Sequence, residues 1–100
     1  MKILALEQEI AGLSAADIEP YLQAEATKVW QYQQDELIRE AYFRRDQATA
    51  VLVLECPSIE AAEEAVGQLP LVAAGLIRFE LIPLRPYTGT ERLFAAGALE

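Results

Sequence analysis

The chain has 100 residues, a length typical of one domain. Its formal net charge is −8, from 16 acidic and 8 basic residues, which argues against nucleic acid as a partner because phosphate binding needs a basic patch. Hydrophobic residues make up 53% of the chain, more than one small core readily hides. The excess predicts a partner surface, and a second copy of the chain is the commonest partner.

The cysteine and histidine counts limit the kinds of disulfide and metal site that the chain can form. Cys56 is the one cysteine and there is no histidine, so an intrachain disulfide is excluded and a zinc site is not expected. The glycines are too far apart to form a phosphate-binding loop. The sequence also shows no cluster of metal-binding residues, so we expect neither a metal nor a cofactor. The sequence shows no signal peptide and no apolar run long enough to cross a bilayer. We therefore predict a cytoplasmic protein without a membrane partner.

The first half of the chain predicts a strand, a helix and a second strand. Residues 2–7 are apolar and partly alternating, as in a strand. Ser14 and Asp17 have the spacing of a helix start, but Pro20 competes with it, so the helix proper is expected to begin near Glu19. A polar stretch then indicates a turn near Asp35. Residues 37–45 show period-2 character with aromatic content, which favours a strand.

The second half predicts a strand, a helix and a last strand. Residues 48–56 are apolar on both alternating sets, so both faces of this strand should be covered. Ser58 can cap a following helix, which Gly67 and Pro70 would end. Residues 76–84 form the last expected strand. The domain core is then 1–86, and residues 87–100 form a C-terminal tail.

The predicted order is β-α-β-β-α-β, the split arrangement of ferredoxin-like α+β domains. Two helices would cover one face of a four-stranded antiparallel sheet. The doubly apolar third strand requires a cover on the other face as well, and a second sheet packed face to face would supply it. The sequence thus predicts a homodimer.

Two segments resemble the muconolactone isomerase-like family of dimeric α/β-barrel proteins. Leu69-Pro70-Leu71, followed by Phe79-Glu80-Leu81-Ile82-Pro83-Leu84, is similar to the ending LPL…(I/F)E(V/L)xPL of muconolactone isomerases, and residues 39–58 are similar in pattern. The resemblance implies a ferredoxin-like fold, facing sheets, a dimer or a ring of dimers, and small ring-shaped organic acids as ligands. Glu40 stands where these isomerases carry a histidine, and Asp35-Glu36 replaces their turn glycine.

A lactone isomerase needs a base that removes a carbon-bound proton and a group that stabilises the enolate. By alternation, Glu40, Tyr42 and Arg44 share one face of the second strand, and we predict these as catalytic residues. Arg78 and Glu80 share one face of the last strand and are predicted to bind substrate. The expected site is a polar pocket on the helix-free sheet surface. Cross-strand pairing that only supports the sheet is the competing explanation.

Trp30, near the end of the first helix, is the remaining predicted substrate-binding residue. It would border the pocket, although large aromatic side chains more often belong to the core. Cys56 lacks a histidine to activate it, which favours a plain buried thiol.

The sequence is compatible with three functions. The leading hypothesis is a cofactor-independent isomerase that transfers a proton on a small organic acid or lactone. The second is a non-catalytic ligand-binding or stress-related protein of the same fold. The third is a cofactorless monooxygenase acting on activated aromatic substrates, which oxygen consumption would reveal.

Overall fold

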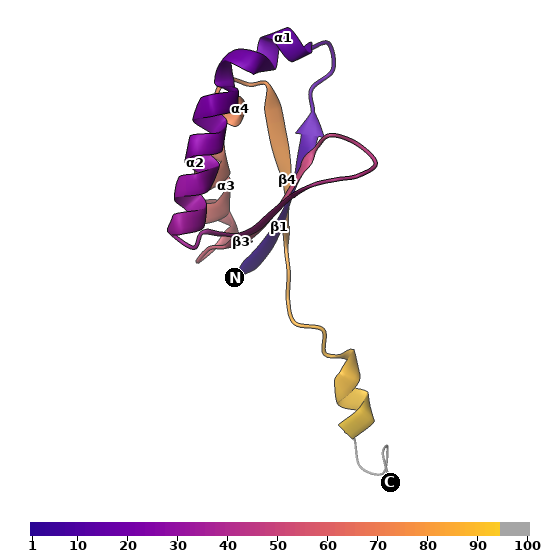
Figure 1. The fold of residues 1–100 in the computed structure, drawn as a ribbon. Coiled ribbons are helices and arrows are strands. Elements are labelled where there is room, and N and C mark those ends of the chain that lie inside the picture. The colour runs from indigo at the N-terminus through magenta and orange to yellow at the C-terminus, as the bar shows by residue number, and fades with distance from the viewer. Residues whose placement is uncertain (95–100) are drawn as a thin grey trace.

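The computed structural model describes residues 1–94, which form one sheet with helices on one side (Figure 1). The N-terminal part contains β1 (Lys2–Glu9), α1 (Ala15–Ile18), a 3₁₀ turn (Glu19–Tyr21), α2 (Leu22–Gln34) and β2 (Ile38–Phe43). The C-terminal part contains β3 (Ala50–Glu55), α3 (Ile59–Gly67), α4 (Pro70–Ala73), β4 (Ile77–Pro83) and a second 3₁₀ segment (Gly89–Phe94).

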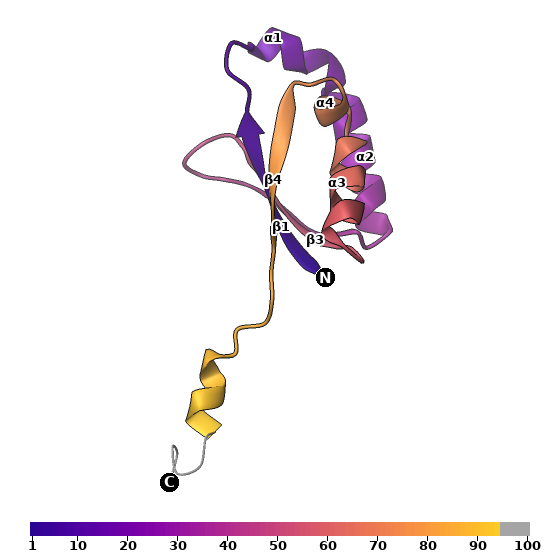
Figure 2. The same ribbon diagram turned by 180° about the vertical axis from the view of Figure 1, so that it is seen from behind.

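The sheet has four strands in the order β2-β3-β1-β4, and all neighbouring strands are antiparallel. The two views in Figures 1 and 2 show α2, α3 and α4 on the same side of the sheet. This is the predicted ferredoxin-like α+β arrangement, which is confirmed. The short helix α4 was not expected. It begins at Pro70, a residue that suits the first turn of a helix because its missing N–H needs no partner there.

The two faces of the sheet differ in burial. On the helix-covered face Ile3, Ala5, Leu52 and Leu54 are at most 3% exposed and pack against helix residues. The strand register places a second apolar set on the helix-free face, where its members are only half-buried: Leu4, Leu6, Val51, Val53 and Ile82. The third strand, predicted to be covered on both faces, is fully covered on one face only within residues 1–94, and the cover of its second face stays a prediction.

Local signals place the ends of the first helical segment. Ser14 and Asp17 form a capping box, in which the Ser14 backbone N–H donates to Asp17 Oδ2 at 2.7 Å. Helix α1 therefore begins before Pro20, and the proline lies in the 3₁₀ turn that joins α1 to α2. The expected turn near Asp35 is confirmed: Glu36 has a φ of 62°, a left-handed conformation that ends α2.

The chain leaves the sheet after β4. The Leu84 N–H donates to Lys2 O at 2.9 Å, and the following residues extend away from the domain (Figure 1). Tyr87 is 83% exposed and Phe94 is 75% exposed. Residues 95–100 of the predicted tail lie outside the described part of the chain.

Candidate functional site

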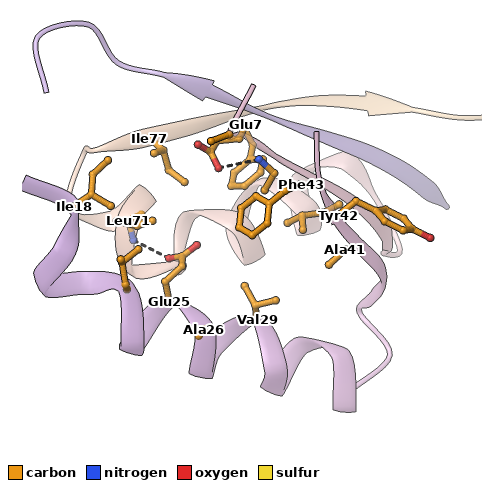
Figure 3. A pocket seen from close by; sticks show the side chains of 15 residues that line it. Glu7, Ile18, Glu25, Ala26, Val29, Ala41, Tyr42, Phe43, Leu71 and Ile77 are labelled. Atoms are coloured by element: carbon orange, nitrogen blue, oxygen red, sulfur yellow. Dashed lines mark hydrogen bonds between the residues drawn. The ribbon is translucent and has the colours of Figure 1, made fainter. Parts of the chain in front are cut away.

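A cavity of about 470 Å³ lies between α2 and the helix-covered face of the sheet (Figure 3). Its size suits a small ligand of one or two rings. Small side chains contribute to this open space, because Ala26 on α2 and Ala41 and Ala50 on the strands all line it. The complete lining is Glu7, Ile18, Leu22, Glu25, Ala26, Val29, Ala41, Tyr42, Phe43, Ala48, Ala50, Leu52, Leu71, Ile77 and Phe79.

Two carboxylates enter this otherwise apolar cavity from opposite walls. Glu7 comes from β1, and its Oε1 accepts a hydrogen bond from the Ala50 N–H at 3.1 Å. Glu25 comes from α2, and its Oε1 accepts from the Leu71 N–H at 2.9 Å. Figure 3 shows both bonds at the walls of the cavity. The backbone donors fix one oxygen of each carboxylate and leave the other oxygen for a ligand.

Both carboxyl groups hold their protons more strongly than an ordinary glutamate. Burial is the main reason that the pKa of Glu7 is raised; the Ala50 N–H opposes it and the Glu9 carboxylate adds to it. Burial also raises the pKa of Glu25, the Leu71 N–H opposes it, and the Glu7 carboxylate raises it further. A charge on Glu7 therefore favours the protonated form of Glu25. Half-buried carboxyl groups with raised pKa values are suited to acid–base work.

Sequence reasoning missed both of these residues, although each carries a signal. Glu7 follows Ile3 and Ala5 at period 2, so it interrupts the buried face of β1 with a charge. Glu25 lies between Leu22 and Val29 at helical spacing, so it interrupts the apolar stripe of α2. A charge inside an apolar stripe is costly to bury without a partner, and it therefore marks a candidate site.

The structure places predicted residues Glu40 and Tyr42 close together. The Tyr42 hydroxyl donates to Glu40 Oε1 at 2.6 Å, and this hydrogen bond raises the pKa of Tyr42. The register opposes Glu40 to Val53 and Tyr42 to Val51, so both lie on the helix-free face. Tyr42 also borders the cavity, but its hydroxyl points away from it in Figure 3.

The other predicted residues lie apart from that pair. Arg44 follows β2, and its Nε donates to Asp46 Oδ1 at 2.8 Å, an ion pair that raises the pKa of Arg44. Arg78 is opposite Gln8, and Glu80 is opposite Leu6, so both belong to the helix-free face.

Trp30 is 60% exposed on α2, so it does not occupy the alternative core position, and it is not among the residues that line the cavity between α2 and the sheet. Its neighbour Tyr32 is the buried aromatic residue of this helix, and its hydroxyl donates to Ala65 O at 2.7 Å. Cys56 is buried as expected, and burial is the main cause that raises the pKa of its thiol.

Within residues 1–94, His, Cys, Asp and Glu side chains form no group of three or more suited to a metal ion. None of the helices in this range combines the length and the apolarity that crossing a bilayer requires.

The fold and the cavity define an α+β, ferredoxin-like protein with a ligand-sized pocket between sheet and helices. A crystal structure of muconolactone isomerase is similar to the chain, with a TM-score of 0.73 and 18% sequence identity over 89% of this chain and 93% of that one. The predicted resemblance is confirmed at the level of the fold. No protein-family description and no curated protein matches the sequence.

Proposed function

We propose that the chain is a cofactor-independent isomerase that moves a proton on a small cyclic substrate held in the cavity. The observation that carries this proposal is the pair Glu7 and Glu25, which project into one apolar cavity with raised pKa values. The similarity in fold to muconolactone isomerase supports the same reaction class.

In this proposal the two carboxyl groups divide the work, with Glu7 acting in its ionised form and Glu25 in its protonated form. The Glu7 carboxylate removes a proton from the carbon next to the substrate carbonyl, and the electron pair moves into an enolate. The protonated Glu25 donates a hydrogen bond to the enolate oxygen, which carries the developing charge. Glu7 then returns the proton to the far carbon of the double bond, so the double bond shifts and no atom is gained or lost.

The test uses a β,γ-unsaturated five-membered lactone in buffered D₂O, with double-bond migration and deuterium uptake at carbon followed by proton NMR. Wild-type protein should accelerate both above the buffer rate. Glu7→Gln should slow turnover by about 10²–10⁴-fold, the usual contribution of a general base. Unchanged turnover in Glu7→Gln would show that Glu7 is not the base.

Glu40 is the second candidate base, favoured by its 2.6 Å hydrogen bond with Tyr42 on the helix-free face. Arg78 and Glu80 lie on β4, at the opposite edge of the sheet, so a catalytic site around Glu40 would have to be completed by the facing sheet of a second copy. Glu40→Gln is therefore the matched variant in the same assay. If it abolishes turnover while Glu7→Gln does not, the site belongs on the helix-free face.

We also propose that this chain forms a homodimer, or a ring of dimers, through the helix-free face. The support is the half-buried apolar set on that face, together with the charged groups Glu80 and Arg78 at its edge. Facing copies would cover the apolar side chains that the helices leave open.

Two other functions remain as outcomes of the assay. Saturable binding of the lactone with no deuterium uptake would favour a ligand-binding protein. Oxygen consumption with a quinol-like aromatic substrate would favour a cofactorless monooxygenase.

A further inference from the structure

We propose that the cavity selects an uncharged ring-shaped ligand, such as a neutral lactone or cyclic enone, in place of the organic acid that the sequence suggested. This inference rests on the proposed cavity site and names its substrate class. It is carried by the chemistry of the lining: thirteen of the fifteen lining residues are neutral, and the other two are the carboxylates Glu7 and Glu25.

The positive charges of the chain lie elsewhere. All eight lysines and arginines fall within the described residues, and none of them lines the cavity. Lys28 lies over the Tyr32 ring with its Nζ 4.9 Å from the ring centroid. Arg44 pairs with Asp46, and Arg39 Nε donates to Glu36 O at 2.6 Å. A carboxylate on the ligand would therefore meet no cation in the cavity.

An anionic ligand would also meet like charge. An ionised carboxyl group at Glu7 or Glu25 would repel the negative charge of such a ligand. Glu7 and Glu25 are half-buried, and repulsion between like charges is stronger beside apolar walls than in bulk water. The whole chain has more acidic than basic residues, so its net negative charge also repels an approaching anion.

A cation fits the cavity less well than a neutral ring. Each carboxylate already accepts a hydrogen bond from a backbone N–H, which offsets part of its charge. The remaining walls are built from aliphatic and aromatic side chains such as Val29, Leu52 and Phe79, so only the second oxygen of each carboxylate and the aromatic ring faces would replace the hydration shell of an ammonium group. A neutral ring with one carbonyl oxygen loses little hydration when it enters the cavity. Its carbonyl oxygen can accept a hydrogen bond from the protonated carboxyl group of Glu25.

The experiment compares three ligands that share one unsaturated lactone ring. One carries an acetic acid side chain, one its methyl ester, and one an aminoethyl group. Binding to the whole chain is measured at pH 8 by amide chemical-shift titration. The ester should bind at least about tenfold more tightly than the free carboxylate. Shifts should centre on Glu25, Val29 and Leu71.

Variants separate cavity binding from binding elsewhere. Val29→Trp fills the cavity and should abolish ester binding, whereas Gln33→Trp, on the same helix but outside the lining, should leave it unchanged. The double change Glu7→Gln and Glu25→Gln removes both charges and should bring the carboxylate and ester affinities within about threefold of each other.

Three results would overturn the inference: tighter binding of the carboxylate than of the ester, tightest binding of the amine, or ester binding that survives Val29→Trp in a folded variant. The readout is binding alone, so it is independent of turnover. If the ester binds in the cavity but is never isomerised, the substrate class stands and the proposed reaction fails.

Discussion

The helix-covered and helix-free faces of the sheet are built from the same strands, yet they have different surroundings. Leu54 is fully buried on one face, and its neighbour Val53 is half-buried on the other. The covered face holds both the core and the cavity with its two carboxylates, whereas the open face holds a row of apolar side chains next to Glu40 and Tyr42. Stability and the proposed chemistry thus belong to one face, and the proposed assembly belongs to the other.

The largest difference between the faces is expected from a matched pair of truncations. Leu54→Ala should lower the free energy of unfolding by about 3 kcal/mol, because it leaves a cavity in a closely packed core. Val53→Ala should cost about 1 kcal/mol or less when measured at a protein concentration low enough to disfavour assembly. Urea denaturation followed by circular dichroism checks both. Equal losses would show that the open face is packed as tightly as the core.

A charge on the open face should disturb assembly. Val51→Asp places a carboxylate within the half-buried apolar row, and the dissociation constant of the proposed dimer should rise at least about tenfold. Sedimentation velocity over a dilution series measures this change. Gln33→Asp, on the outer side of α2, is the control. A wild-type chain that is monomeric at every concentration would contradict the proposed dimer.

A third comparison removes one hydroxyl group from the helix-covered side of the molecule and one from the helix-free side. Tyr32→Phe deletes the buried hydrogen bond to Ala65 O that joins α2 to α3, and should lower the free energy of unfolding by about 1 kcal/mol. Tyr42→Phe deletes an exposed hydrogen bond to Glu40 and should cost less than about 0.5 kcal/mol in the monomer. A larger loss from Tyr42→Phe would indicate that this pair is buried in the assembly.

The smallest effect concerns the pH dependence of stability. The raised pKa values of Glu7 and Glu25 mean that the folded chain binds more protons than the unfolded chain above the ordinary glutamate range. The free energy of unfolding contributed by these groups is therefore highest below that range and falls as pH rises through the raised pKa values. Glu25→Gln should make this fall smaller, as measured by urea denaturation at successive pH values.

Asp17 supplies a control of opposite sign for the pH experiment. Its hydrogen bonds from Ser14 lower its pKa, so its stabilising contribution is present above the ordinary aspartate range and is lost as pH falls. Asp17→Asn should therefore reduce stability at neutral pH and have little effect in acid. A Glu25→Gln variant that behaves like Asp17→Asn would contradict the raised pKa of Glu25.

Much of the fold could be predicted because its signals are local. The capping pattern of Ser14 and Asp17, the cap at Ser58 and the turn after Asp35 depend on a few adjacent residues. The Ser58 hydroxyl accepts from the Ala61 N–H at 3.1 Å, as its position predicts. The strands predicted over 37–45, 48–56 and 76–84 are each somewhat shorter in the structure, since the ends of elements depend on tertiary packing.

The candidate site was less predictable, because strand alternation alone does not show which face is hollowed. Alternation along the strand correctly placed Glu40 and Tyr42 on one face. The surroundings of these two side chains depend on a register shift between Ile38 and Glu40 in the β2–β3 pairing and on the position of α2. The cavity lies on the opposite face, where Ala26 on α2 and Ala41 and Ala50 on the strands line it. Only the packing of that helix against the sheet brings Glu25 to the same cavity as Glu7.

The sequence by itself determined the order of the elements, the antiparallel α+β class and the two apolar faces of β3, because these follow from spacing and local backbone preferences. The tertiary structure decided where the open space lies and which ionisable groups meet there, because both depend on contacts between segments far apart in the chain. The burial that raises the pKa of Glu7 and Glu25 arises only once α2 has packed over the sheet.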